Sequence, residues 1–408
     1  MTLKMNNPEA LHTPQVQALP KDRLAGLKEN WRGDLTSGFI LFLIALPLSL
    51  GIAIASGAPP MAGIISAIVG GIIVSQISGS YLTINGPAAG LIVVIVASVE
   101  RLGGGVAGYH ATLAAVVVSG IFLFLLGVFK AGVLGKFFPA TVVHGLLASI
   151  GIIIMLKQLP FMLGVVPPAK EPLELFLKIP QIFANLNPEI ALVGFASMLV
   201  LILHSLSRNQ AIKRIPAPIL VVSLAMGMGS LFSLDHAHSY NFMGHTYFID
   251  PTKALVCLPC NAGTSLCGPD WGHIATYGFW VSVMSITLIQ GIETLLSCAA
   301  VDHLDPYKRE SDLSRDMSAV GIGSAIAGMI GGLPMIAEIV RSTANVANGA
   351  KTRWSNFFHG SFMLVFVVVA ASLINHIPLA ALAALLVFTG FRLTSPKVFK
   401  DTHALGLE

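Results

Sequence analysis

Long apolar segments separated by short polar ones run from about residue 36 to residue 392. A helix that crosses a hydrocarbon core of about 30 Å needs roughly 20 apolar residues, so segments of this length predict membrane spans. The runs are continuous rather than alternating, which disfavours a transmembrane β-barrel. The pattern predicts an all-α polytopic membrane protein with an interfacial helix at 172–185. Its expected spans are 36–56, 61–78, 107–129, 139–157, 188–206, 217–233, 276–300, 316–331, 357–375 and 378–392.

Two shorter apolar segments, 87–99 and 337–348, predict half-helices that enter the bilayer without crossing it. Each follows an irregular stretch, Gly79 to Pro87 in one case and Gly331 to Pro334 in the other. Irregular backbone at membrane depth survives only where it is buried in protein or lines a polar cavity. The two stretches lie about 250 residues apart, each after a pair of full spans. This arrangement indicates an inverted-repeat transporter whose half-helices meet at the membrane midplane. Two ordinary Gly/Pro loops are the alternative.

The expected organisation has four parts. Residues 1–35 form a polar lead-in that lacks the apolar region and cleavage site of a signal peptide. Residues 36–233 form the first inverted repeat, and residues 234–275 form a polar loop. Residues 276–400 form a second repeat, which is incomplete.

Composition supports the membrane assignment and sets the orientation. Hydrophobic residues make up 54% and charged residues 11% of the chain, against about 25% charged in soluble domains. With a cytoplasmic N-terminus, 18 of the 24 Lys and Arg residues lie inside and 5 outside. This bias follows the positive-inside rule, so we expect a bacterial inner membrane protein with loop 234–275 outside. The net charge of +4 comes without a basic tract, so nucleic acid is not an expected partner.

Few of the expected spans contain an ionisable residue, and Glu293 is one exception. A charge at a helix centre costs about 2.5–3.5 kcal/mol on insertion scales, so such residues usually face a cavity or a partner. Gln290, Glu293 and Ser297 share one helical face, which can offer oxygens to Na⁺ or hold a proton. We therefore predict that Glu293 belongs to a coupling-ion site. An acid paired with a basic residue purely for packing is the alternative.

Glu338 and Arg341 are the other exceptions, three residues apart at the mouth of the second half-helix, with Ser342 beside them. An anion there would meet free N–H groups, the positive end of a helix dipole and a guanidinium. The spacing also permits an internal Glu338–Arg341 ion pair that leaves nothing for a ligand.

The 234–275 loop contains three of the four cysteines, Cys257, Cys260 and Cys267, together with four histidines. A second closely spaced cysteine pair is missing, and an outside location favours a disulfide or free thiols over zinc. No metal or cofactor is expected. The sequence also has no nucleophile elbow, P-loop or HExxH pattern, so neither an enzyme nor an ATP-driven pump is indicated. Ion gradients are the expected energy source.

Several motifs together resemble the SulP sulfate-permease family of inorganic anion transporters. They cover about residues 33–395. The motifs are Gly33-Asp34-Leu35-Thr36-Ser37-Gly38, Ala45-Leu46-Pro47, Ile84-Asn85-Gly86-Pro87, Arg341-Ser342, Asn348-Gly349-Ala350-Lys351-Thr352 and Ile377-Pro378-Leu379-Ala380-Ala381-Leu382.

The resemblance implies two inverted seven-segment repeats, with a core domain that carries the site and a gate domain against which it moves. The substrate is then expected between the half-helices that begin near Pro87, Ala88 and Ala337, with Arg341 at the anion. The resemblance also places Ser297 where sodium-coupled bicarbonate members have a hydroxyl, next to the acid Glu293. Glu338 stands where a small residue is typical, which leaves it as a second candidate for the coupling-ion site. The chain ends before the last two spans and the cytoplasmic STAS domain typical of the family.

The leading hypothesis is a secondary transporter of sulfate or bicarbonate, coupled to H⁺ or Na⁺. A non-transporting membrane scaffold, or an inactive fragment of such a transporter, is the alternative from another class. An enzyme acting on bicarbonate would need a metal site that the 234–275 loop only hints at. The sequence leaves open the choice of anion and of coupling ion, and whether the chain forms a homodimer.

Overall fold

The computed structural model describes residues 19–133, 140–169, 171–209, 212, 215–257 and 268–394. Helices form at every span expected from the sequence. They are α1 (Arg23–Ala55), α2 (Pro60–Val69) continued by η1 (Gly70–Val74) and α3 (Ser75–Ile77), α5 (Gly105–Val128), α6 (Ala140–Met162), α9 (Pro188–Leu206), α11 (Ala217–Leu231), α13 (Tyr277–Leu304), α14 (Leu313–Met329), α16 (Trp354–Ile374) and α17 (Leu379–Leu393).

Five of these helical stretches are long and apolar enough to cross a membrane: Arg23–Ala55, Pro60–Ile77, Gly105–Val128, Pro188–Leu206 and Tyr277–Leu304. The first begins 13 residues before the expected span, because Asp22 caps it by accepting a hydrogen bond from the Arg23 N–H. Part of the polar lead-in therefore continues the first span as helix. The expected interfacial helix is two short helices, α7 (Pro172–Leu177) and α8 (Ile179–Ala184).

Both predicted half-helices are present, and each is preceded by a three-residue strand. Strand β1 (Asn85–Pro87) leads through a 3-10 turn, η2 (Ala89–Leu91), into α4 (Ile92–Arg101), and β4 (Met335–Ala337) leads into α15 (Ile339–Ala347). The strands pair antiparallel, with Asn85 opposite Ala337 and Pro87 opposite Met335. The two irregular stretches therefore meet each other, as an inverted repeat with half-helices at the midplane requires.

Tertiary partners satisfy the backbone of these stretches. The Glu338 N–H donates to the Ile84 carbonyl at 2.8 Å, and the Ile84 N–H donates to Ser342 Oγ at 2.9 Å. In the second stretch, Ser66 Oγ donates to the Leu333 carbonyl at 2.6 Å. Non-helical backbone is stable here because it is buried and hydrogen-bonded rather than exposed to lipid.

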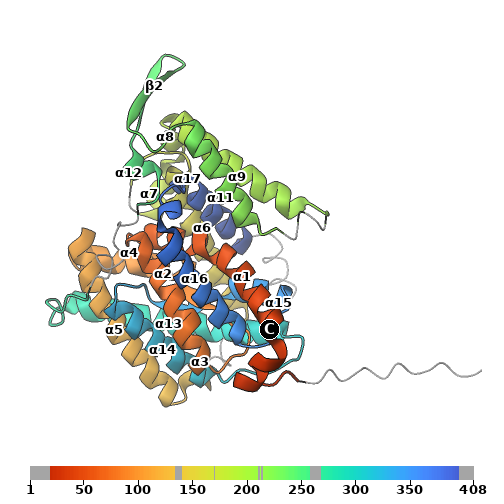
Figure 1. Cartoon of the computed structure of the whole chain (residues 1–408). Coiled ribbons are helices and arrows are strands. Elements are labelled where there is room, and N and C mark those ends of the chain that lie inside the picture. Colours follow the sequence, from red (N-terminus) through yellow and green to blue (C-terminus); the bar gives the residue numbers. More distant parts are fainter. Residues whose placement is uncertain are drawn as a thin grey trace, which may run out of the picture.

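The helices form two groups (Figure 1). The core consists of α1, α2 with η1, α5, α13, α14 and α16, packed around the two half-helices. The gate consists of α6, α9, α11 and α17, which lie together in the upper part of Figure 1. Helix α1 contacts α17 and α11, so it forms much of the seam between the two groups.

Two of the sequence motifs contact each other where α1 packs on α16. Asp34 accepts hydrogen bonds from the N–H groups of Lys351 and Thr352, at 2.8 and 3.2 Å. Gly38 lets the helices approach closely, since a Cβ there would lie 2.7 Å from the Phe358 Cβ. The motif that begins at Gly33 thus holds the start of α16 against α1.

The 234–275 segment contains a hairpin, β2 (His238–Phe242) and β3 (His245–Ile249), which extends away from the helices in Figure 1. Tyr240 anchors it, since its hydroxyl donates to Asn187 Oδ1 at 2.8 Å at the start of α9. A short helix, α12 (Pro251–Ala254), follows the hairpin. Cys257 is exposed, and Cys260 and Cys267 lie outside the described residues.

Candidate functional site

Arg341 lies at the junction of the two half-helices. It is in the first turn of α15 and is 0% exposed. Its Nη2 donates to the Pro87 carbonyl in β1 at 3.3 Å. Its Nη1 lies against Gly86, where a Cβ would approach it to 2.6 Å. The side chain that begins on one half-helix therefore ends on the strand of the other.

Two guanidinium nitrogens of Arg341, Nε and Nη1, have no hydrogen-bond partner among the described residues. Burying a donor without an acceptor costs the full desolvation free energy of that donor, and burying an unpaired charge costs more. The N–H groups of Nε and Nη1 are therefore unused, and the guanidinium carries a full positive charge inside the core.

Glu338 supplies part of the compensation for this charge. Its carboxylate caps α15 by accepting the Arg341 backbone N–H at 3.1 Å, and Oε2 lies 3.6 Å from Arg341 Nε. The predicted internal ion pair is thus present, but at a distance that makes no hydrogen bond to the guanidinium. The chain's own carboxylate occupies the positive end of this half-helix.

Glu293 faces the first half-helix from α13. It is 5% exposed, and its Oε1 has no hydrogen-bond partner among the described residues. A Cβ at Gly90 would lie 1.8 Å from that oxygen, so the carboxylate rests directly on the turn that starts the half-helix. No side chain caps this turn. The two carboxylates, Glu293 and Glu338, are near enough to interact electrostatically.

The other predicted residues have distinct positions. Pro87 and Ala337 are the ends of β1 and β4, and Ala88 is the extended residue between Pro87 and the first half-helix. Ser342 donates to the Glu338 carbonyl at 2.6 Å and accepts from Ile84, so its hydroxyl is engaged in holding the half-helix. Ser297 is buried on α13, and its Oγ has no partner among the described residues.

Gln290 has a positioning role on the Glu293 face of α13. Its amide donates to the Met335 carbonyl at the start of β4, at 2.7 Å, and to Ser324 on α14. It therefore fixes the strand that leads to Arg341.

The sequence analysis did not single out a second group of buried polar side chains, on α16 and β1. Asn356 donates to Asn85 Oδ1 at 3.0 Å, and His359 is 0% exposed with neither ring nitrogen hydrogen-bonded among the described residues. The available signal was a histidine close to the start of the 357–375 span. Polar residues at that place are common where a helix leaves the membrane, so the signal is weak without the fold.

This arrangement suits the transient binding of a small anion. It combines a buried guanidinium with unused donors, a half-helix start without a side-chain cap, and carboxylates that keep the empty site from carrying a large net charge. Among the described residues, no cluster of three or more His, Cys, Asp or Glu side chains is placed to hold a metal ion.

The chain is similar to known proteins in sequence and in fold. The sequence profile of the sulfate permease family matches residues 31–406. The chain is 26% identical to the putative sulfate transporter YvdB of Bacillus subtilis, over 90% of this chain and 66% of that protein. It is 23% identical to the bicarbonate transporter BicA of Picosynechococcus, over 92% of this chain and 64% of that protein. The chain thus spans about two thirds of the length of these relatives.

Solved structures show the same fold. The transmembrane domain of a cyanobacterial bicarbonate transporter BicA superposes with a TM-score of 0.77, at 23% identity, over 92% of this chain and 94% of that one. The structure of SLC26A9 superposes with a TM-score of 0.73, at 14% identity, over 93% of this chain and 60% of that one.

Proposed function

This chain belongs to the sulfate permease family, and we propose that it is a secondary active transporter of a small inorganic anion, sulfate or bicarbonate. Curated relatives are named as transporters of these two anions. We further propose that H⁺ or Na⁺ couples to the anion, and that the N-terminus lies in the cytoplasm of a bacterial inner membrane. The basic residues of the sequence support this orientation.

The observation that carries the proposal is the buried, incompletely bonded Arg341. An oxyanion leaving water needs a compensating charge, and a half-helix start supplies only about half a unit. A guanidinium supplies a full charge in a planar fork that matches two oxygens of an oxyanion, which a lysine cannot reproduce. Nε and Nη1 of Arg341 are the two nitrogens that have no partner among the described residues, so their N–H groups remain for the oxygens of an anion.

Glu338 and Glu293 have separate roles in this proposal. Glu338, which lies 3.6 Å from Nε, holds the guanidinium between cycles and releases it to the anion. Glu293 belongs to the coupling-ion site, because a carboxylate repels an anion but suits Na⁺ or H⁺. Ser297, one turn further along α13, adds a free hydroxyl to that site.

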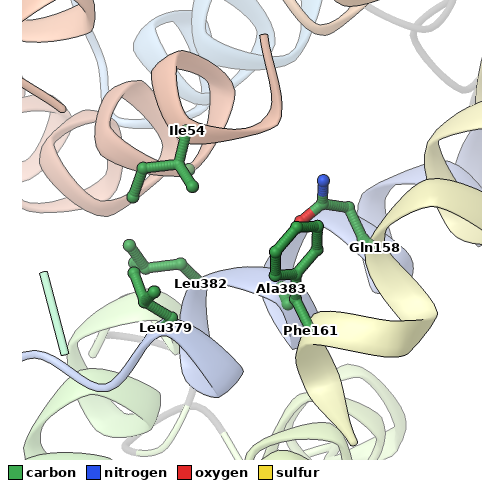
Figure 2. Close-up of a pocket in the computed structure, with 7 residues that line it drawn as sticks. Ile54, Gln158, Phe161, Leu379, Leu382 and Ala383 are labelled. Carbon is green, nitrogen blue, oxygen red and sulfur yellow. The ribbon is translucent and has the colours of Figure 1, made fainter. Parts of the chain in front are cut away.

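Transport also needs the site to reach both sides of the membrane. We propose that the core moves as a body against the gate, along the seam made by α1. A small pocket opens in this seam, with Ile54 of α1 on one side and Leu382 of α17 on the other (Figure 2). Its lining is apolar except for Gln158 of α6, so at this point of the seam the two surfaces meet through apolar side chains.

Anion binding to the purified protein tests the proposal. Removing one partner of a buried charge pair costs about 2–5 kcal/mol, so we expect Arg341→Ala to abolish measurable sulfate or bicarbonate binding. Arg341→Lys should weaken binding strongly, because it keeps the charge but loses the fork. Arg392→Ala, at an exposed arginine of α17, is the matched control and should bind as the wild type does. Titration calorimetry gives all three affinities.

Near wild-type affinity in Arg341→Ala would show that the arginine serves packing alone. Uptake into proteoliposomes then separates the transporter from the scaffold. Well-folded protein that shows no sulfate or bicarbonate flux above empty vesicles would favour a scaffold.

A further inference from the structure

His359 lies in the core and has no partner. It is on α16, fully buried, and neither Nδ1 nor Nε2 has a hydrogen-bond partner among the described residues. A neutral imidazole carries one donor and one acceptor, and leaving both unused in a protein interior is costly. Such a group is retained where it gains a partner in another state of the protein.

The surroundings of His359 contain further unused polar atoms. Asn356 precedes it by three residues, so both side chains lie on the same face of α16. Asn356 Nδ2 bonds to Asn85 in β1, but Asn356 Oδ1 and Asn85 Nδ2 have no partner among the described residues. The face of α16 that meets β1 is therefore polar and incompletely bonded.

Helix packing holds this face close to the anion site. Gly71 of η1 and Gly360 of α16 are in close contact, since a Cβ at Gly71 would lie 2.5 Å from the Gly360 Cα. The η1 segment is a π-helical turn, a feature that is frequent at functional sites. Helix α1 also approaches here, since a Cβ at Gly38 would lie 3.0 Å from the backbone nitrogen of His359. His359 is thus held between η1 and α1, and it directly precedes Gly360, the residue of α16 that contacts Gly71 of η1.

Few charged groups face this position. On α1, Asp34 is engaged at the start of α16 with Thr352, and Asp22 is paired with Arg353. The segments α2, η1, α3 and β1 contain no titratable residue. From α15 and its cap come Arg341 and Glu338, and the Arg341 guanidinium lies against Gly86, which follows the Asn85 that Asn356 contacts.

We propose that His359 is a proton site coupled to the anion site through the charge of Arg341. The inference rests on the proposed function and deepens it, because it identifies a proton-carrying group other than Glu293. While no anion is bound, the guanidinium, which Glu338 compensates only in part, adds to the cost of burial in disfavouring a second positive charge nearby. An oxyanion on Arg341 cancels that charge, and His359 then takes a proton from the aqueous side to which the site is open. Asn356 Oδ1 provides an acceptor for the new N–H.

Binding must then be reciprocal, since a proton that follows the anion also strengthens anion binding. Sulfate affinity should rise by up to about tenfold for each unit by which the pH falls through the range where His359 titrates. Sulfate is the anion of a strong acid and stays fully ionised at neutral pH, so protons taken up on binding belong to the protein.

The experiment measures sulfate binding and proton uptake together, on the purified full chain in weakly buffered detergent solution. Wild-type protein should take up about one proton per sulfate bound. His359→Gln should still bind sulfate, with proton uptake near zero and an affinity that no longer depends on pH. His376→Gln, at an exposed histidine just beyond the same helix, is the matched control and should behave as the wild type.

Several outcomes overturn the inference. Sulfate binding to the wild type without proton uptake would remove the proton site while leaving the anion site intact. Full proton uptake in His359→Gln, or its loss in Glu293→Gln where His359 is unchanged, would place the proton on Glu293 instead. If His359→Gln and His359→Asn both fail to fold, Glu293→Gln still tests the inference. Retained proton uptake in that variant would support it, and lost uptake would contradict it. Absence of sulfate and bicarbonate binding to the wild type would overturn the proposed function, and this inference with it.

Discussion

At the scale of single residues, the balance between burial and bonding at Arg341 explains how a site can bind and still release its ligand. The guanidinium makes one hydrogen bond, to Pro87, and a longer ion-pair contact with Glu338. A fully bonded arginine would have little to gain from an anion, and one without any acidic neighbour would be too costly to bury. Because Arg341 is only partly bonded, an anion that binds to it would recover part of the free energy lost in burying the guanidinium.

In the proposed mechanism Glu338 competes with the anion for the same guanidinium, and its removal should reveal this. We expect Glu338→Gln to tighten sulfate or bicarbonate binding about three- to tenfold, which corresponds to roughly 0.7–1.4 kcal/mol. Glutamine can still cap the half-helix but carries no charge to repel the anion. Calorimetric titration measures the change, with Glu310→Gln at an exposed acid as control. Weaker binding would show that Glu338 orients the guanidinium more than it competes with the ligand.

Two glycines allow the proposed anion and coupling-ion sites to be disturbed separately. A Cβ at Gly86 would lie 2.6 Å from Arg341 Nη1, whereas a Cβ at Gly90 would lie 1.8 Å from Glu293 Oε1. Gly86→Ala should therefore lower anion affinity by displacing the guanidinium and leave the dependence on the coupling ion unchanged. Gly90→Ala should alter that dependence first.

Binding and flux measured against pH and sodium concentration distinguish the two variants. Gly227→Ala, where a Cβ would meet nothing within 4 Å, controls for the added methyl group. Equal effects of both substitutions on anion affinity would contradict the separation of the two sites.

The sequence predicts some of these residues better than others. Glu293, Glu338 and Arg341 stand out because a charge inside an apolar span is rare and costly. Asn356 does not stand out, because its importance comes from its hydrogen bond to Asn85 in β1, about 270 residues earlier in the chain. Ser342 follows Arg341 in the sequence, so the sequence suggests it as a site residue. Its hydroxyl instead accepts a hydrogen bond from Ile84, and that contact depends on tertiary packing.

At the scale of elements, the half-helices were predictable and their pairing was not. Their shortness and the preceding Gly/Pro stretches mark them in the sequence. The strands β1 and β4 have only three residues each, too few for any alternation of polar and apolar positions. They exist because each stretch finds in the other the hydrogen-bond partners that lipid cannot supply.

The contact between α1 and the start of α16 makes a prediction at this scale. Asp34 accepts from the backbone of Lys351 and Thr352 and from the Thr352 hydroxyl, using both carboxylate oxygens. An asparagine offers only one acceptor oxygen, so Asp34→Asn leaves a buried donor unsatisfied and should cost about 1–3 kcal/mol of stability. Thermal unfolding in detergent should show a lower midpoint, whereas Glu29→Gln on the exposed face of the same helix should not. An unchanged midpoint would show that other contacts already hold α16 in place.

At the scale of the whole molecule, the core and the gate differ in how they are joined. Within the core, polar bonds cross between helices and strands at many points, as between Ser37 and Asn345 or Gln290 and Met335. At the seam between core and gate, the pocket lining is apolar apart from Gln158 (Figure 2). Apolar side chains at this point of the seam form no interlocking hydrogen bonds, which favours motion of one body against the other.

A disulfide across this seam tests the motion directly. A Cβ at Gly51 of α1 would lie 3.6 Å from the Leu382 Cβ of α17, within the usual range of about 3.5–4.5 Å for a disulfide. We expect Gly51→Cys with Leu382→Cys, in a chain whose four native cysteines are replaced, to form the bond on oxidation. The bond should stop anion flux into proteoliposomes, because α1 and α17 can no longer move apart. It should leave equilibrium anion binding within about threefold of the reduced protein, since Arg341 and both half-helices lie within the core. Reduction should restore flux, and each single cysteine variant should be insensitive to oxidant. Full flux through the cross-linked protein would mean that the core does not move against the gate at this seam, and that access to Arg341 changes within the core itself.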